Sequence, residues 1–131
     1  YDAVLKFHEK FGQLIGPLPA IPSDKVRTLR VSLIDEEKKE LELALLSNDM
    51  PEIADACADL IYVIVGTAIS YGIDLRPVFN EVQRTNMAKE NGGSRADGKI
   101  LKPAGWTPPD IEGVLVKQGW VKPTHEPEFH A

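Results

Sequence analysis

The sequence predicts an all-α fold, and two observations lead to this prediction. Apolar residues recur at helical spacing near the N-terminus, where Val4, Phe7 and Phe11 lie three or four positions apart. Glycine and proline, which interrupt helices, gather in the link at 16–22 and in the C-terminal part of the chain. The residues between these two regions are therefore expected to be mostly helical.

The first two helices are expected at residues 2–14 and 24–47. The link "GPLPAIPSD" ends the first helix, and Ser23 or Asp24 caps the second. The second segment contains neither glycine nor proline, which is typical of a long, uninterrupted helix.

The third helix is expected to open at "NDMPE", where Asp49 and Glu52 resemble a capping box, and to run to about Ser70. Its residues are apolar or small nearly all round, which is typical of a helix buried on most sides. Asp74 is the expected cap of a fourth helix, which ends at "NGG". Four helices from one short chain cannot cover the third helix completely, so we expect a four-helix bundle completed by oligomerisation.

The C-terminal part is expected to be irregular. "ADGK", "KPAG" and "TPPD" are turn sequences, and only a short helical turn is expected, near 111–115. We therefore assign residues 1–115 to a single domain and residues 116–131 to a C-terminal tail.

Length and charge exclude some classes of protein. At 131 residues and 43% hydrophobic, the chain has the length of one domain. A net charge of −5, from 15 Lys and Arg against 20 Asp and Glu, argues against a sequence-independent nucleic-acid binder, which needs a basic surface. The longest apolar run, 60–69, is shorter than the roughly 20 residues of a membrane span, and no signal peptide is visible. We expect a cytoplasmic protein with no nucleic-acid or membrane partner.

Isolated cysteine, histidine and tryptophan residues favour structural roles. Cys57, the single cysteine, has small apolar neighbours and is expected to pack in the interior. Trp106 is expected to anchor the C-terminal region on the helices more than to stack on a base. Surface or packing roles are expected for the scattered histidines, His8, His125 and His130.

The stretch "LIDEEKKELELALL" carries acids on an unexpected side of its helix. By itself "EEKKE" is typical of a solvated face. On a helical wheel, however, Glu36, Glu37 and Glu40 fall on the arc of Leu33 and Ala44, and the lysines lie opposite. Three carboxylates therefore interrupt the stripe that should pack.

The third helix carries acids on an apolar background. Asp55 and Asp59 lie one turn apart, with Glu52 on the same stripe. A buried carboxylate normally takes up a proton or finds a cation, and the sequence places no basic residues on the facing stripes. Oxygen-only ligation favours magnesium or manganese over zinc. The alternative is a pair of capped or salt-bridged core acids.

The fourth helix adds an amide to its apolar stripe. Asn86 falls on the face of Phe79 and Val82, and Lys89 follows one turn later. Either the backbone of another helix satisfies this amide, or the amide contacts a polar ligand.

These motifs together resemble a known superfamily. "DEEKKEL", "DACADLIYVIVGTAISYGID", "FNEVQRTNMAKENG" and "ADGKILKPAGWTPPDIEGVL" are similar, in order, to the all-α nucleotide pyrophosphohydrolases. These are the MazG-like enzymes, phosphoribosyl-ATP pyrophosphohydrolase and the dimeric dUTPases. The E-E-x-x-E element is weak alone, but the ordered set, over about 28–115, is specific. The resemblance implies a four-helix MazG-like bundle.

The resemblance also implies a metal site, with Mg²⁺ as the cofactor and Mn²⁺ as a substitute. The implied metal ligands are Glu36, Glu37, Glu40, Asp55 and Asp59, and Glu36 or Glu37 is the implied catalytic base. The family's second motif is commonly E-x-x-D, but Ala56 stands three residues before Asp59. Either Asp55 or Glu52 is therefore the fourth ligand.

The implied reaction is hydrolysis of a nucleoside triphosphate to the monophosphate and pyrophosphate, by attack of water at the α-phosphorus. Such activity serves control or house-cleaning of the nucleotide pool. The alternatives are a phosphoribosyl-ATP pyrophosphohydrolase and a non-catalytic, metal-stabilised helical dimer.

The implied partners are the nucleotide and further copies of the chain. Similar proteins are dimers or tetramers, so a homodimer or homotetramer is expected, in which a neighbouring chain completes the pocket. For Lys99 and Lys102, the alternative to substrate binding is that they are ordinary loop lysines in contact with solvent. The candidate substrate-binding residues are Asn86, Lys89, Arg84, Lys99 and Lys102.

Overall fold

Helices are the main regular secondary structure in the part of the chain that the structure describes. The computed structural model describes residues 1–124, which contain five helices and no strand beyond one isolated bridge. The all-α prediction is thus confirmed. The chain consists of two compact units, Tyr1–Leu75 and Arg76–Ala131.

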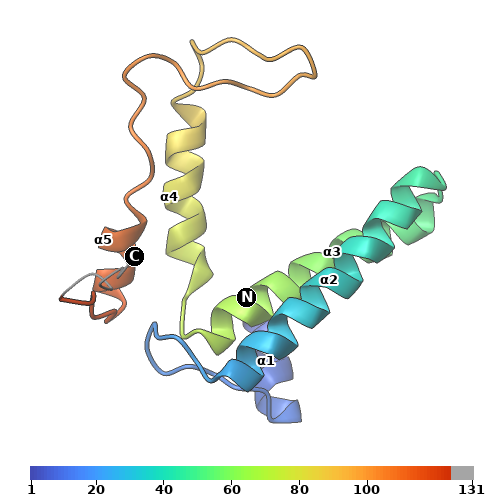
Figure 1. Cartoon of the computed structure of the whole chain (residues 1–131), viewed down its shortest axis with the longest axis vertical. Coiled ribbons are helices and arrows are strands. Elements are labelled where there is room, and N and C mark those ends of the chain that lie inside the picture. The colour runs from blue at the N-terminus through green and yellow to red at the C-terminus, as the bar shows by residue number, and fades with distance from the viewer. Residues whose placement is uncertain (125–131) are drawn as a thin grey trace, which may run out of the picture. The chain divides into compact units, whose positions relative to one another are not determined.

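The first unit contains α1 (Asp2–Phe11), α2 (Asp24–Leu46) and α3 (Met50–Ser70). Helices α2 and α3 lie side by side as an antiparallel hairpin, and α1 packs against α3 (Figure 1). The turn between α2 and α3 is short because Asn48 adopts the left-handed conformation, with φ 52°.

Both helices of this hairpin begin at a side-chain cap, as the sequence predicts. Oγ of Ser23 accepts from the Val26 amide at 3.4 Å, and Oδ1 of Asp49 accepts from the Glu52 amide at 3.4 Å. Each cap satisfies an amide that has no partner within its helix, which stabilises the helix by about 1 kcal/mol.

Helix α1 ends three residues earlier than predicted. Gly12 adopts the left-handed conformation, with φ 66°, and the amide of Gln13 donates to the His8 carbonyl at 3.0 Å. This C-cap turns the chain away from the helix axis before Leu14.

The link between α1 and α2 crosses the C-terminal end of α3. The Gly16 amide donates to the Ile69 carbonyl, and the Ser70 hydroxyl donates to the Leu14 carbonyl, both at 3.0 Å. A Cβ at Gly16 would lie 2.5 Å from the backbone nitrogen of Gly72, so only glycine permits this close crossing.

Helix α3 is buried on one side only within the chain. Ala56 is 3% exposed, but Ile61 is 62% and Ile64 is 44% exposed. Within the single chain, α1 and α2 cover only part of the helix, as expected, and burial on its other sides stays a prediction for the oligomer. Cys57, which was expected to pack in the interior, is exposed in the single chain.

Helix α3 is long and apolar enough to cross a membrane, and an 18-residue stretch of it has a mean hydropathy of 1.6. The uninterrupted apolar run 60–69 is only part of this helix. One such helix is weak evidence for a membrane span, since the core helix of a soluble protein has the same length and composition.

The second unit is built on α4 (Leu75–Met87) and α5 (Ile111–Lys117). Helix α4 ends before the predicted "NGG", because the amides of Ala88 and Lys89 bond three residues back instead of four. The predicted short helical turn near 111–115 is confirmed as α5.

The connection from α4 to α5 is irregular, as predicted, and folds back on itself once. The Arg95 amide donates to the Lys99 carbonyl at 2.7 Å, and Gly98 closes this turn with φ 93°. The residues from 125 onward, including His125 and His130 and the end of the predicted tail, lie outside the described residues.

Candidate metal centre

Three carboxylates meet between α2 and α3. Glu37 and Glu40 lie one turn apart on α2, and Asp59 faces them from α3. Each offers an oxygen, and these oxygens all lie within 4.8 Å of one another. The antiparallel hairpin thus brings together acids that are about 20 residues apart in the chain, and this set is called the carboxylate cluster.

The carboxylate cluster carries uncompensated negative charge. Oε2 of Glu37 is buried and has no hydrogen-bond partner among the described residues. Burial raises the pKa of the Glu37 carboxyl, and the neighbouring charges of Glu40, Asp59 and Glu36 raise it further. A divalent cation would reverse this effect, because it favours the ionised form of every acid around it.

Basic side chains on α2 do not compensate these acids. Lys38 pairs with Glu42 at 3.6 Å and Lys39 pairs with Asp35 at 2.8 Å, on the other side of the helix. This arrangement agrees with the helical wheel. Oxygen-only ligands without a basic neighbour fit a hard divalent cation such as Mg²⁺ or Mn²⁺.

Two of the predicted ligands lie outside this group. Glu36 and Asp55 are exposed, and neither belongs to the three acids that converge. Ala56 is the residue that faces inward one turn before Asp59, so a methyl group fills the place of the glutamate in E-x-x-D.

Glu52 lines a hollow together with one acid of the carboxylate cluster, Glu40. Ala44 also lines this hollow, which has a volume of about 250 Å³ and lies between the ends of α2 and α3. This shared hollow favours Glu52 over Asp55 as a further oxygen ligand.

A cavity that was not predicted from the sequence opens beside the carboxylate cluster. Its volume is about 320 Å³, and its walls include Leu33, Tyr62 and Val63. Leu33 lies one turn before Glu37, and the other two lie one turn after Asp59, so the cavity and the cluster adjoin along the same helix pair. Phe7 of α1 forms an edge-to-face contact with Tyr62, with ring centroids 5.5 Å apart.

The most notable wall residue is Arg30, which is 5% exposed. Its Nε donates to Oγ1 of Thr67 at 3.0 Å and its Nη2 to the Val63 carbonyl at 2.8 Å. No acid among residues 1–124 pairs with it, and burial lowers its pKa. A buried guanidinium without a counter-ion is costly, so its place in a cavity wall suggests a ligand.

His8 lies beside Arg30 in the same wall. It is 2% exposed, and its Nδ1 lies 3.1 Å from the Leu14 carbonyl. Burial lowers its pKa, and the charge of Arg30 lowers it further, although the hydrogen bond to Leu14 opposes both effects. The packing role expected for His8 is confirmed, and the neutral imidazole donates to the carbonyl.

The candidate substrate-binding residues all belong to the second unit. Asn86 is exposed and Thr85 is the buried residue, so the expectation that Asn86 lies on a buried stripe is wrong. Asn86 and Lys89 line one hollow of about 420 Å³. Arg84 pairs with Glu81 at 2.7 Å, and Lys99 and Lys102 are exposed.

The two units differ in charge. Residues 1–75 contain 7 Lys or Arg and 13 Asp or Glu, whereas residues 76–131 contain 8 and 7. The excess of acids therefore lies in the unit that holds the carboxylate cluster.

Comparison with known proteins covers the first unit and α4. The family model for phosphoribosyl-ATP pyrophosphohydrolase matches residues 4–86. An uncharacterized protein of Acanthamoeba polyphaga mimivirus is 38% identical over 79 residues, which are 57% of this chain and 32% of the viral protein. The chain therefore spans about a third of the length of that relative. Lys89, Lys99, Lys102 and Trp106 lie beyond the match to the family model.

Proposed function

The chain belongs to the phosphoribosyl-ATP pyrophosphohydrolase family, and from this premise we propose that it is a Mg²⁺-dependent nucleoside triphosphate pyrophosphohydrolase. Membership of the family implies pyrophosphohydrolase activity on a nucleotide. The narrower proposal is hydrolysis to the monophosphate and pyrophosphate, in control or house-cleaning of the nucleotide pool. The observation that carries it is the carboxylate cluster, with its buried, unpartnered Glu37 oxygen.

Five acids have roles in this proposal. Glu37, Glu40 and Asp59 hold the metal, with Glu36 and either Asp55 or Glu52 as further ligands. When bound, Mg²⁺ would neutralise phosphate charge and lower the pKa of a water molecule. Glu36 or Glu37 orients that water and accepts its proton. Glu36 suits the second task because it is exposed beside the carboxylate cluster.

The adjoining cavity is the proposed place for the nucleoside. A volume of about 320 Å³ is at the lower end of the range for small-molecule sites. The Phe7 and Tyr62 rings offer apolar and stacking surfaces to a base. Arg30 offers only donors, so it favours a base or ribose oxygen as acceptor. The wall therefore has the chemistry of a nucleoside site.

The second unit offers cations for the phosphates. Neutralising the leaving pyrophosphate needs positive charge beyond that of the metal. Asn86 is exposed and lines a hollow together with Lys89, which supports a ligand role more than a packing role. The proposed substrate contacts are Asn86, Lys89, Arg84, Lys99 and Lys102.

We also propose that the active form is a homodimer or homotetramer. Ile61 and Ile64 on α3 are 62% and 44% exposed in the single chain, and Leu43 on α2 is 66% exposed. A second copy covering this apolar face would remove it from water, and a two-fold contact is the commonest arrangement.

The test is a substrate panel. The protein is incubated with Mg²⁺ and with canonical and modified ribo- and deoxyribonucleoside triphosphates, and with phosphoribosyl-ATP, and the products are separated. Monophosphate plus pyrophosphate from at least one triphosphate is the expected result. Hydrolysis of phosphoribosyl-ATP alone would establish that alternative activity. Metal-dependent thermal stability without any turnover would instead support the non-catalytic dimer.

A further inference from the structure

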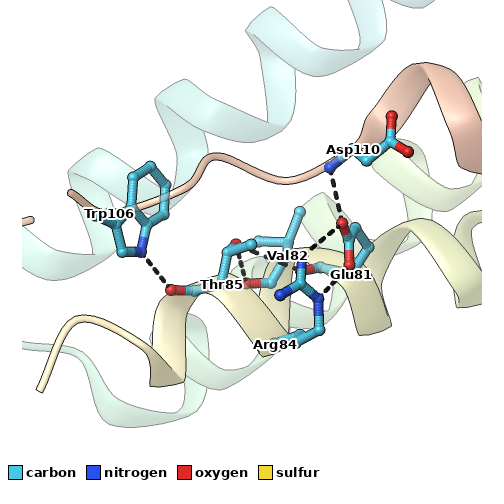
Figure 2. Close-up of polar contacts among 6 residues, drawn as sticks. All are labelled: Glu81, Val82, Arg84, Thr85, Trp106 and Asp110. Atoms are coloured by element: carbon cyan, nitrogen blue, oxygen red, sulfur yellow. Dashed lines mark hydrogen bonds and ion pairs between the residues drawn. The ribbon is translucent and has the colours of Figure 1, made fainter.

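Trp106 is fastened to α4 by a segment that follows the helix closely. Its Nε1 donates to the Thr85 carbonyl at 2.7 Å, and the Asp110 amide donates to Oε2 of Glu81 at 2.7 Å (Figure 2). These two anchors are four residues, or about one turn, apart along α4. The indole is thus held in place on the helix.

Thr85, whose carbonyl accepts the hydrogen bond from the indole, is the most buried of the described residues in the second unit. Thr85 is 1% exposed, and its hydroxyl donates to the Val82 carbonyl at 3.0 Å, as Figure 2 shows. Trp106 itself is half-buried, so one part of the ring remains open to solvent. The ring is therefore both fixed and accessible.

Two ammonium groups approach this one ring. Nζ of Lys89 lies 5.1 Å and Nζ of Lys102 lies 5.0 Å from its centroid. A cation–π contact at an exposed site contributes about 0.5–1 kcal/mol. The two distances place the ammonium groups no more than about 10 Å apart, although 13 positions separate their residues in the sequence.

No acid pairs with either lysine among the residues that the structure describes. Arg84 is paired with Glu81 and Arg95 with Asp97, and Glu90, which lines one hollow together with Lys89, forms no ion pair with either lysine. Two like charges without a counter-ion repel each other. An anion would remove the repulsion.

Lys89 and Trp106 each line a separate hollow. Trp106 and Arg84 line a hollow of about 430 Å³, and Lys89 and Asn86 line another of about 420 Å³. The two lysines and Trp106 lie beyond residue 86, where the match to the family model ends. Family membership therefore assigns no role to Trp106.

We propose that Trp106 is a positioning residue, which holds Lys89 and Lys102 together as a site for a pyrophosphate group. This inference rests on the proposed function: the group is either the terminal phosphates of the bound triphosphate or the released pyrophosphate. A pair of ammonium groups suits a diphosphate better than a single phosphate, because the charge of a diphosphate extends over two phosphorus centres.

The direct test is the fluorescence of Trp106. Replacing Trp120 by phenylalanine leaves Trp106 as the single tryptophan of the chain. Adding inorganic pyrophosphate to this protein in EDTA should change the emission in a saturable, salt-sensitive way, and inorganic phosphate should bind more weakly. Lys89→Gln or Lys102→Gln should weaken pyrophosphate binding about tenfold, whereas Lys117→Gln, the same change elsewhere in the unit, should not.

Two variants test whether Trp106 positions the two lysines or only attaches its segment to α4. Trp106→Phe keeps an aromatic face and loses the bond to Thr85, whereas Trp106→Leu loses both. Pyrophosphate binding, measured by calorimetry, should weaken slightly in the first variant and about as much as in the lysine variants in the second. Circular dichroism checks that both remain folded. Equal binding by all three proteins would overturn the proposal.

Kinetics separate the two sources of the pyrophosphate group. If Lys102→Gln raises KM and leaves kcat unchanged, the site holds the phosphates of the substrate. If it weakens only product inhibition by pyrophosphate, the site holds the product. Normal KM and normal product inhibition would overturn the inference and remove Lys102 from the proposed substrate contacts, whereas the hydrolysis of a nucleoside triphosphate by this variant would still support the proposed activity. Lysine-dependent pyrophosphate binding in a protein that hydrolyses no nucleotide would overturn the proposed function and leave the anion site.

Discussion

Arg30 of α2 donates from Nε to Oγ1 of Thr67 on α3 at 3.0 Å, inside the helix pair that carries the carboxylate cluster. This bond and the one to the Val63 carbonyl fix the two helices relative to each other two turns from Glu37. The relative position of α2 and α3 decides whether the three acids converge.

Arg30→Lys should therefore weaken the protein although it keeps the charge. A lysine cannot form the two-pronged contact to Thr67 and Val63. We expect the free energy of unfolding to fall by about 1 kcal/mol, measured by urea denaturation. Arg27→Lys is the matched control, because Arg27 is exposed and its pair with Asp24 contributes little. An equal effect in both proteins would contradict the structural role of Arg30.

Gly66→Ala should destabilise α3, although alanine favours helix. A Cβ at this position would lie 2.8 Å from Nη2 of Arg30 and 2.8 Å from Nε2 of His8, both of which are held by other bonds. Overpacking of this kind costs about 1–3 kcal/mol. Ala58→Gly, at an exposed position of the same helix, should cost only about 1 kcal/mol. A more stable Gly66→Ala protein would show that the His8–Arg30 wall is loosely packed.

Glu37→Gln should abolish turnover and leave the metal-free protein at least as stable as the parent. The folded-state pKa of Glu37 is raised, so stability is fully present below its ordinary value of 4.5 and is lost as the pH rises through the raised value. The glutamine of the variant does not ionise, so the variant does not lose stability in this pH range. Thermal unfolding in EDTA from pH 4.5 to 8 measures the difference, and added Mg²⁺ should stabilise only the parent. Glu42→Gln, on the opposite face, is the control.

The contact of Glu81 with Asp110 should resist acid. The bonds from Arg84 and from the Asp110 amide lower the Glu81 pKa to about 2, so this stabilisation is present above pH 4.5 and is lost only as the pH falls towards 2. Carboxyl chemical shifts recorded by NMR should show Glu81 ionised at pH 3. Glu112, which pairs only with the exposed Lys122, serves as the comparison. A Glu81 carboxyl that titrates near pH 4.5 would show that the segment is not held on α4.

Ile64→Lys should separate the proposed oligomer. Ile64 lies on the exposed apolar face of α3, and a charge there would oppose association. Light scattering should give the mass of one 14.5 kDa chain, and activity should fall with it. Val121→Lys, at an exposed position of the second unit, should change neither. Full activity in a monomeric sample would contradict the proposal that a neighbouring chain completes the site.

The sequence by itself determined the helices and the side of α2 that carries the acids. Ser23 and Asp49 are local caps, so no distant contact is needed to place the starts of α2 and α3. The end of α1 at Gly12 is also local, but the predicted helix ran on to Leu14. The wheel position of Glu37 and Glu40 likewise follows from the helical period alone. These features depend on neighbours a few residues away.

Tertiary structure alone decided which acids converge and what lies beside them. Asp59 meets Glu37 and Glu40 because the short turn at Asn48 sets the register of two antiparallel helices, and the same register points Ala56 inward and leaves Asp55 outside. Residues of three helices line the cavity that contains Arg30, so the pattern of a single helix cannot predict this cavity. Distances across helices depend on how whole faces pack against one another, and the period of one helix contains no information about its partner.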